Sequence, residues 1–208
     1  MKIGLFGGTF DPPHKGHTAV AAAARDALGL DRVEVVPCAG PPHRPPATAG
    51  PFDRFAMAVL AFLDFDRLVV SPREIARGGI SYTVETLREL QSEWPGAELF
   101  LIVGGDSYDE LPTWRDAQEI ERLAHLAVVG RPGAGGLDAV RPADRPRLRE
   151  PGEPAPPGCR AVYRVPMAPQ PVSASAIRRT LARGGDPGAV LDPRVRRYIE
   201  KRALYHGA

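Results

Sequence analysis

The sequence predicts an α/β fold in which a doubly wound parallel sheet carries helices on both faces. Three features predict it. Short apolar runs alternate with segments of helical spacing, the runs have the length of buried strands, and the first run leads through a glycine pair into an alanine-rich helix. Short apolar strands that alternate with helices are typical of parallel sheets, because the crossover between parallel strands is usually a helix.

The expected elements follow one another in strand and helix order over most of the chain. Thr83 is expected to cap one helix, and Ser173 or Ser175 to cap a later one. Glycines at 184 and 185 are expected to end that later helix. Strands are expected at residues 3–6, 33–36, 68–70, 99–103 and 126–129, and helices at 18–28, 52–63, 83–94, 172–183 and 193–203.

The domain organisation expected from the length is one core with an appended lobe. A chain of 208 residues can bury one sizeable core. Residues 1–171 are predicted to form a nucleotide-binding α/β domain, and residues 172–208 a small C-terminal helical subdomain that completes a phosphate site. Ten of the 23 prolines fall between residues 131 and 171. We therefore expect an irregular, exposed excursion at about residues 133–160.

The most informative segment runs from Thr9 to His17 and reads Thr-Phe-Asp-Pro-Pro-His-Lys-Gly-His. It follows a glycine pair and precedes a helix, so the backbone can approach an anion and the helix start favours phosphate. Two imidazoles and an ammonium within four residues, His14, His17 and Lys15, are donors suited to a polyphosphate. An isolated histidine is more often a surface or core residue, and we expect that of the three others, His43, His125 and His206.

The position of this segment in the sheet is also expected to matter. In open parallel sheets, ligands bind beyond the carboxyl ends of the strands. The loop from Gly7 to His17, the sequence Gly104-Gly105-Asp106 and the residues after Val36 are therefore predicted to lie along one rim.

The segment from Thr9 to His17 resembles a family signature. The nucleotidylyltransferase superfamily carries (His/Thr)-x-Gly-His, and the longer form Gly-Gly-Thr-Phe-Asp-Pro-x-His-x-Gly-His is similar to that of the bacterial nicotinate-nucleotide adenylyltransferases. The resemblance implies a Rossmann-like nucleotidylyltransferase fold and adenylyl transfer from ATP to nicotinate mononucleotide, which gives deamido-NAD and pyrophosphate in NAD biosynthesis. The dinucleotide fingerprint Gly-x-Gly-x-x-Gly is absent from the sequence, which removes the main support for an NAD-dependent dehydrogenase.

Later patches extend the resemblance. Residues 81–87 resemble the family's Ser-Tyr-Thr-x-x-Thr-Leu element on the nicotinate side of the pocket. Residues 104–114 resemble its Gly-x-Asp…Leu-x-x-Trp stretch, residues 131–133 its Arg-Pro-Gly turn, and residues 172–178 its second phosphate-binding helix start. The chain departs from the pattern at three positions, where Arg44 replaces a lysine, Ala174 a serine and Ser175 a threonine.

The resemblance implies three groups of site residues. The catalytic group comprises His14, His17, Lys15 and Arg178. The ATP and phosphate group comprises Gly7, Gly8, Thr9, Phe10, Gly16, Gly104, Asp106, Ser173, Ser175 and Ile177. The acceptor group comprises Arg44, Arg54, Tyr82, Thr83 and Trp114. Mg²⁺ is the implied cofactor, held by phosphate oxygens and water rather than by a protein cage.

Charge, cysteine content and apolar content limit the partners. The formal net charge is +2 and the arginines are interleaved with acids, so no nucleic acid is expected as a partner. Apolar runs are short, and the N-terminus lacks the pattern of a signal peptide, so no membrane partner and a cytoplasmic location are expected. The two cysteines, Cys38 and Cys159, are interpreted as free thiols. Small-molecule substrates are the expected partners, and a homodimer is left open.

Alternatives stay open at several levels. The acceptor could be nicotinamide mononucleotide or phosphopantetheine, and the chain could be a catalytically silent nucleotide-binding or scaffold protein. Trp114 could be a plain core residue. Asp106 could cap a short helix, and Arg178 could form a surface ion pair.

Overall fold

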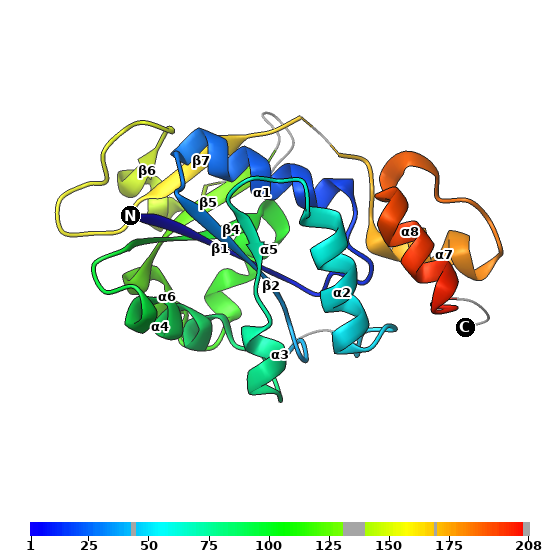
Figure 1. The fold of residues 1–208 in the computed structure, drawn as a ribbon. Helices are drawn as coiled ribbons and strands as arrows, with labels where there is room; N and C mark the ends of the chain where they lie inside the picture. The colour runs from blue at the N-terminus through cyan, green and yellow to red at the C-terminus, as the bar shows by residue number, and fades with distance from the viewer. Residues whose placement is uncertain (43–44, 131–139, 169, 206–208) are drawn as a thin grey trace. The chain divides into compact units, whose positions relative to one another are not determined.

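The computed structural model describes residues 1–42, 45–130, 140–168 and 170–205, and these form an α/β fold around one sheet (Figure 1). The strand order in the sheet is β3-β2-β1-β4-β5-β7-β6. The pairs β1·β4, β4·β5, β5·β7 and β6·β7 are parallel, as the sequence predicts. The strands are β1 (Lys2–Gly8), β2 (Arg32–Pro37), β3 (Leu68–Val70), β4 (Glu98–Gly104), β5 (Ala124–Gly130), β6 (Leu148–Arg149) and β7 (Val162–Pro166).

Helices connect most of these strands, and the five helices expected from the sequence are all present. The α-helices are α1 (Lys15–Leu28), α2 (Pro51–Phe62), α3 (Arg73–Arg77), α4 (Thr83–Glu93), α5 (Gly105–Glu110), α6 (Ala117–Leu123), α7 (Ala174–Ala182) and α8 (Pro193–Lys201). Short 3₁₀ turns are η1 (Leu111–Thr113), η2 (Pro142–Arg147) and η3 (Gly188–Val190). The predicted doubly wound α/β class is confirmed.

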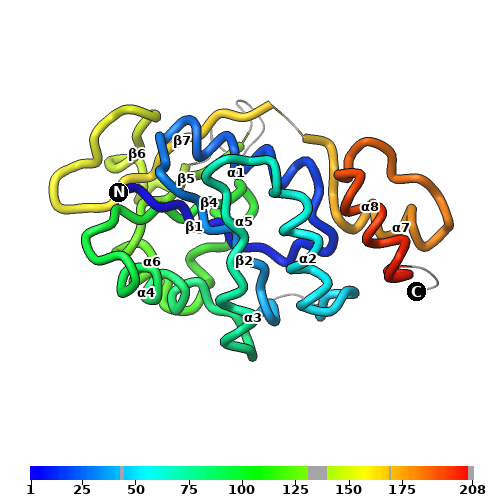
Figure 2. Tube along the Cα trace, viewed as in Figure 1, coloured from blue at the N-terminus to red at the C-terminus, as the bar shows by residue number. Residues whose placement is uncertain are grey.

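The described chain divides into two compact units, each assembled from segments that are distant in sequence. The first unit consists of Met1–Phe6, Val20–Glu34 and Tyr82–Pro169; the second consists of Gly7–Ala19, Val35–Ser81 and Gln170–Ala208. The predicted division into residues 1–171 and 172–208 stays a prediction. The trace in Figure 2 follows the chain through both sets of segments. We describe each unit by itself.

The core of the first unit is a row of apolar side chains that crosses four strands. Leu5 of β1 pairs with Leu101 of β4, which pairs with Leu126 of β5, which pairs with Val162 of β7. All four side chains are buried. Burial of one such side chain contributes about 1.5–3 kcal/mol, so this row fixes the register of the sheet.

In the second unit, the C-terminal helices pack on α2. Helix α8 contacts α2, with Val195 and Ile199 buried. The hydroxyl of Tyr198 on α8 donates to the carboxylate of Asp53 in the first turn of α2, at 2.7 Å. Ser173 caps α7 by accepting a hydrogen bond from the backbone N–H of Ala176, as predicted.

Several helix boundaries differ from the sequence-based expectation. Helix α1 begins at Lys15 rather than Thr18, because the carbonyl of His14 already accepts the N–H of His17. Thr83 is the first residue of α4 and not its cap, since the cap position is held by Tyr82 with no side-chain hydrogen bond. Helices α3, α5 and α6 have only five to seven residues, too few to give a periodic signal in the sequence.

Over residues 140–160, which the structure describes, the predicted excursion is mostly irregular and its residues are exposed or half-buried, with Val140 and Asp144 as the buried exceptions. Residues 142–147 form the turn η2, and the carboxylate of Asp144 is 3% exposed. It accepts hydrogen bonds from the hydroxyl of Tyr108 on α5 and from the guanidinium groups of Arg141 and Arg147. Both arginines also bind Glu121 on α6. These hydrogen bonds and ion pairs stabilise the proline-containing turn η2. Residues 133–139 of the excursion lie outside the described residues.

The two cysteines and His125 have the environments that the sequence predicts. Cys38 and Cys159 are free cysteines, as predicted. His125 is a satisfied core residue, because it is buried and its Nδ1 accepts the N–H of Ala161 at 2.9 Å. Across the described ranges, no helix combines the length and apolar character that crossing a membrane requires.

Candidate active site

The two histidines of the His-x-x-His sequence stack at the start of α1. Their ring centroids are 3.8 Å apart and their planes differ by 23°. The backbone N–H of His14 donates to Nδ1 of His17 at 3.2 Å, and the N–H of His17 donates to the carbonyl of His14 at 2.8 Å. Because Nδ1 of His17 accepts, its neutral ring carries the proton on Nε2 and presents a donor there.

Both imidazoles are neutral at pH 7 in this structure. Burial lowers the pKa of His14 to about 4. Burial, followed by the charge of the neighbouring His14, lowers the pKa of His17 to about 3. Nδ1 of His14 is buried and has no hydrogen-bond partner among the described residues. An anionic group beside the rings would favour their protonated forms, so the pair is suited to a ligand that brings negative charge.

Glycines and Phe10 give this loop its shape. A Cβ atom on Gly16 would lie 2.9 Å from Cγ1 of Val172 and 3.0 Å from the His14 ring, so glycine permits the contact between α1 and the chain before α7. A Cβ on Gly8 would lie 3.0 Å from the ring of Phe10, whereas one on Gly7 would meet open space. Phe10 is 1% exposed, and its ring packs edge-on against His17 at 5.0 Å. The buried ring of Phe10 therefore packs against the imidazole of His17 and helps to position it.

Arg178 brings helix α7 to the same loop. Its Nη1 donates to the backbone carbonyl of Asp11 at 2.6 Å and lies 3.7 Å from the Asp11 carboxylate. The side chain is 33% exposed, so the guanidinium is neither free on the surface nor sealed in the core. Arg178 therefore forms an ion pair, as the alternative interpretation expected, but with a buried carboxylate rather than a surface one, and its role at a phosphate stays a prediction.

The other predicted residues of α7 have different roles. The hydroxyls of Ser173 and Ser175 are exposed and 3.3 Å apart at the start of the helix, where they could meet a phosphate. Ile177 is 3% exposed and its N–H donates to the carbonyl of Ser173. Its predicted place among the phosphate-binding residues is therefore corrected to a packing role. Lys15 is exposed at the first position of α1, and its role in phosphate binding stays a prediction.

Asp11 is the centre of a hydrogen-bond network that the sequence does not reveal. Its carboxylate is 4% exposed and accepts from the N–H groups of Thr48 and Ala49 and from the hydroxyl of Tyr205. Its partners are 37, 38 and 194 residues away in the chain, and no local pattern predicts them.

Arg54 is corrected from an acceptor-binding residue to a buried brace. It is 1% exposed, and its guanidinium donates to the carbonyls of Thr9, Ala39 and Ala49 at 2.8–3.2 Å. These contacts hold the loop that contains Thr9 and the chain after β2 together. With its donors used in this way, Arg54 has no geometry for binding an acceptor phosphate directly. Arg44, the other predicted acceptor-binding arginine, lies outside the described residues.

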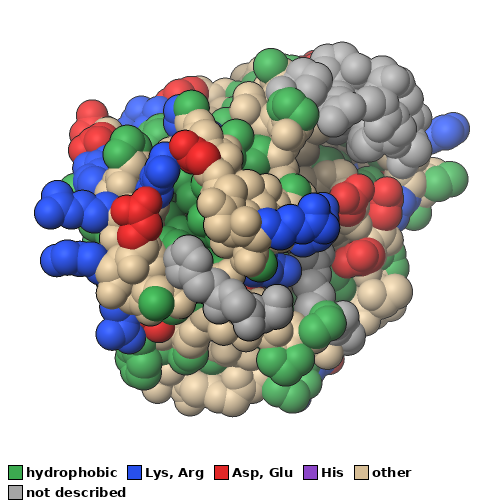
Figure 3. Space-filling model, turned by 90° about the vertical axis from the view of Figure 1, so that its right-hand side faces the viewer, with side chains coloured by type: hydrophobic (Ala, Val, Ile, Leu, Met, Phe, Trp, Pro, Cys, Tyr) green, Lys and Arg blue, Asp and Glu red, His purple; other side chains and the backbone are tan. Residues whose placement is uncertain are grey.

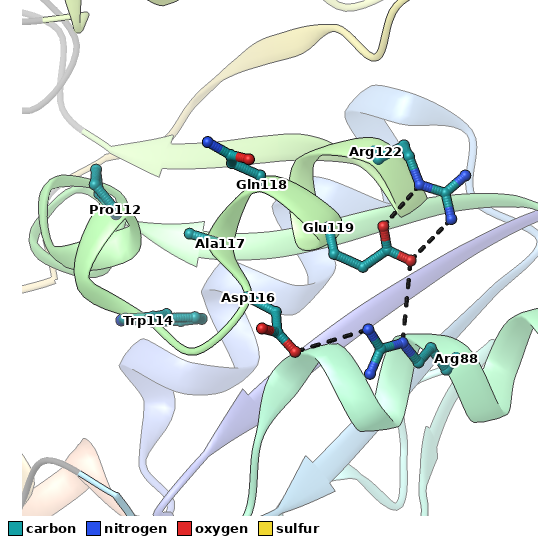
Figure 4. A pocket seen from close by; sticks show the side chains of 8 residues that line it. All are labelled: Arg88, Pro112, Trp114, Asp116, Ala117, Gln118, Glu119 and Arg122. Carbon is teal, nitrogen blue, oxygen red and sulfur yellow. Dashed lines mark hydrogen bonds and ion pairs between the residues drawn. The ribbon is translucent and has the colours of Figure 1, made fainter.

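Predicted acceptor residues of the first unit lie near one another at the start of α4 and after η1. Trp114 is half-buried and lines a cavity of about 610 Å³ with Pro112, Ala117 and Gln118 (Figure 4). The remaining wall of this cavity is a set of ion pairs that joins Arg88 to Asp116 and Glu119, and Arg122 to Glu119. Trp114 is therefore not a plain core residue.

Tyr82 and Thr83 are half-buried, and Arg115, the residue after Trp114, lies over the Tyr82 ring. The guanidinium of Arg115 lies 4.5 Å from the centroid of the Tyr82 ring and 3.3 Å from the carboxylate of Glu85. Gly104 ends β4 and holds the cap position of α5, whose first turn exposes Asp106. Since no side chain caps α5, the alternative role of Asp106 as a helix cap has no support.

Comparison with known proteins agrees with this arrangement. The cytidylyltransferase-like family model matches residues 5–180. A protein of Laribacter hongkongensis (strain HLHK9), described as "Probable nicotinate-nucleotide adenylyltransferase", is 42% identical over 209 residues, which cover 99% of this chain and 94% of the relative. One with the same description from Bordetella pertussis is 39% identical, over 98% of each chain. This chain belongs to the nicotinate-nucleotide adenylyltransferase family.

Solved structures of distant members share the fold of this family. Plasmodium falciparum nicotinic acid mononucleotide adenylyltransferase, in its complex with NaAD, matches with a TM-score of 0.73 at 15% identity, over 98% of this chain and 97% of that one. The resemblance drawn from the segment Thr9 to His17 is thereby confirmed at the level of family and fold. An NAD-dependent dehydrogenase is excluded on the same grounds.

Charged side chains are mixed on the surface of this family member. On the face shown in Figure 3, blue basic side chains lie among red acidic ones. Among the described residues, several charged side chains form ion pairs, for example Arg194 with Asp64 at 2.6 Å and Arg196 with Asp186 at 2.9 Å. Within the described residues, no group of three or more His, Cys, Asp or Glu side chains gathers in a way that could hold a metal ion.

Proposed function

We propose that this protein transfers the adenylyl group of ATP to nicotinate mononucleotide, with deamido-NAD and pyrophosphate as products. The observation that carries the proposal is the placement of the stacked pair His14 and His17, Arg178 and the capped start of α7 around one loop of the second unit. Full-length relatives with the nicotinate-nucleotide adenylyltransferase description, at 38–42% identity, support the acceptor.

The proposed reaction is direct attack of the mononucleotide phosphate on the α-phosphorus of ATP. A phosphate oxygen forms the new P–O bond while the bond to the pyrophosphate oxygen breaks, and no protein nucleophile takes part. The thiol of Cys38 fits this, since burial raises its pKa and keeps it protonated. Positioning and charge stabilisation then account for the rate.

Residues of the loop from Gly7 to His17 and of the start of α7 would have different roles in the reaction. Neutral His17 and His14 would donate hydrogen bonds to the phosphates, and their pKa values would rise as the triphosphate arrives. Lys15 and Arg178 would offset the charge that develops on the leaving pyrophosphate. Gly7 and Gly8 would let the backbone approach the ligand, and Ser173 and Ser175 would present hydroxyls at a second helix start.

Mg²⁺ fits this site as a companion of the triphosphate. The buried carboxylate of Asp11 is occupied by two N–H groups and a hydroxyl, and Asp106 is a single exposed carboxylate. Neither offers a protein cage, and Mg²⁺ commonly keeps several waters and binds through substrate phosphates. When bound, the ion would neutralise charge on the phosphate oxygens.

The acceptor ring would lie against Trp114, whose half-buried indole lines the cavity in Figure 4. Backbone and hydroxyl donors near Thr83 would bind the nicotinate carboxylate, and Arg44 would bind the acceptor phosphate bidentately. We also infer a cytoplasmic protein without a nucleic-acid partner, supported by the two free cysteines and the mixed surface charge. The homodimer stays open to a measurement of mass in solution.

The experiment is a direct product assay. The protein is incubated with ATP, Mg²⁺ and, in separate reactions, nicotinate mononucleotide, nicotinamide mononucleotide and phosphopantetheine, and the products are identified by mass. Deamido-NAD and pyrophosphate in equal amounts are expected. Formation of NAD alone or dephospho-coenzyme A would move the assignment to another acceptor, and no product with any acceptor would favour the silent nucleotide-binding protein.

A further inference from the structure

We propose that Tyr205 is a positioning residue for the triphosphate, acting through the buried carboxylate of Asp11 on the guanidinium of Arg178. All three residues belong to the second compact unit. The inference rests on the proposed function, because it takes ATP as the ligand. It adds to that function a residue of the C-terminal segment that contacts no expected substrate atom.

The Asp11 carboxylate is stabilised by three hydrogen bonds. Two come from the backbone N–H groups of Thr48 and Ala49, at 2.8 and 3.1 Å. The third comes from the hydroxyl of Tyr205, at 2.7 Å, and both residues of this pair are about 5% exposed or less. The hydroxyl is thus the side-chain donor that compensates a carboxylate removed from water.

Arg178 is a cation already close to this carboxylate, and it could be drawn in if the Tyr205 donor is lost. Its Nη1 donates to the backbone carbonyl of Asp11 at 2.6 Å but stays 3.7 Å from the carboxylate. A buried carboxylate that loses a donor becomes poorly solvated and attracts an adjacent cation more strongly. Removal of the Tyr205 hydroxyl should therefore turn the Arg178 guanidinium onto Asp11 and away from a bound phosphate.

The hydroxyl is suited to this role over the whole working pH range. Burial and the adjacent Asp11 carboxylate raise the pKa of Tyr205 above its usual value. The group therefore stays protonated and remains a donor. A charged side chain in its place would compete with Arg178, whereas a neutral hydroxyl satisfies the carboxylate and leaves the guanidinium for the ligand.

The test compares Tyr205→Phe with a matched control, Tyr198→Phe. The Tyr198 hydroxyl donates to the carboxylate of Asp53 in α2 at 2.7 Å, the same distance as in the Tyr205–Asp11 pair. Both hydroxyls belong to the C-terminal segment, and both bind a carboxylate from an earlier part of the chain. Calorimetry gives the Kd of a non-hydrolysable ATP analogue, and kinetics give the KM values for ATP and acceptor. We expect Tyr205→Phe to raise the Kd and the KM for ATP at least 5-fold, with the acceptor KM within 2-fold. Tyr198→Phe should leave all three within 2-fold.

Equal ATP affinity in the two variants would overturn the proposal, since a merely structural hydrogen bond predicts a lower Tm in both and no change in Kd. The route through Asp11 is tested by Tyr205→Phe in an Asp11→Asn background, which also serves if the single variant does not fold. Without the carboxylate charge, Tyr205→Phe should change the Kd less than 2-fold, and a persistent effect would contradict the route. Wild-type protein that binds the analogue without making a dinucleotide would reject the proposed function and leave this test in force.

Discussion

The imidazole of His14 stacks on that of His17 at a centroid distance of 3.8 Å, and both rings are neutral at pH 7. Stacking two bases in a partly buried loop disfavours their charged forms, because burial and mutual repulsion act in the same direction. Under the proposed function, the negative charge of a bound triphosphate would favour the protonated forms instead. The protonation of this pair should therefore depend on whether an anionic ligand is bound.

His17→Ala should slow adenylyl transfer by about 10²–10³-fold, the scale for loss of one transition-state donor. The fold should change little, since the loop that carries His17 is held by contacts of Asp11 and Arg54. The measurements are kcat and Tm of the same preparation.

His125→Ala is the control for this variant. His125 is buried and accepts the N–H of Ala161, so its loss should lower Tm while kcat per folded molecule stays near the parent value. Activity of His17→Ala within a few-fold of the parent would remove His17 from the mechanism.

Arg178→Ala should weaken ATP binding and slow the transfer step together, because the guanidinium that donates to the Asp11 carbonyl is also proposed to offset the charge of the leaving pyrophosphate. The adjacent Arg179→Ala is the matched control, since Arg179 is exposed on the same helix. Steady-state kinetics for ATP should separate the two variants. If the Arg178 variant differs from the Arg179 variant only in Tm, the role of Arg178 is structural.

Acid should destabilise the protein through its histidines. His14 and His17 have pKa values of about 4 and 3 in the folded state, below the unfolded value of about 6.5. Between the folded and unfolded pKa values, the unfolded state binds more protons than the folded state. The stability that the two neutral imidazoles contribute is therefore fully present above pH 6.5, and it is lost as the pH is lowered toward 4 for His14 and toward 3 for His17. Each histidine contributes at most about 1.4 kcal/mol per pH unit in that window.

Urea unfolding at pH 4.5–7.5 measures this dependence. The double variant His14→Gln/His17→Gln should lose stability less steeply than the parent as the pH falls. Parallel curves for the two proteins would show that the imidazoles are not held neutral by the fold.

Asp144→Ala should destabilise the protein by about 3 kcal/mol, because removal of one partner leaves buried cations uncompensated. Arg141 and Arg147 both bind this carboxylate and have side chains less than 20% exposed. The free energy of unfolding from urea titration checks it. Asp64→Ala, which breaks an exposed ion pair with Arg194, should change stability little. Similar values for the two variants would show that the excursion does not contribute to the core.

Sequence reasoning predicted the parts of the molecule that depend on local pattern. The strands at 3–6, 68–70 and 99–103 are set by short apolar runs, and the Ser173 cap is set by a local hydrogen bond, so both were predicted and found. The family was predicted because the residues from Thr9 to His17 are contiguous and their chemistry is specific.

What the sequence did not predict depends on contacts between distant residues. Tyr205 reaches Asp11 across 194 positions, and Arg54 reaches the carbonyl of Thr9 across 45. The burial of Asp144 depends on a hydroxyl 36 residues earlier. Proline density indicated irregular backbone in this segment, but it carries no information about a buried polar network that packs such backbone against a helix.

The central claim is that the acceptor is nicotinate mononucleotide, and the ratio of kcat/KM for this mononucleotide to that for its amide tests it most directly. A carboxylate accepts from two aimed donors, whereas the amide brings its own NH₂ against one of them and leaves a donor unpaired. That costs about 1–3 kcal/mol, or roughly ten- to hundred-fold in selectivity. The account predicts a ratio of at least about ten in favour of nicotinate mononucleotide. A ratio near one, or one that favours the amide, would contradict it.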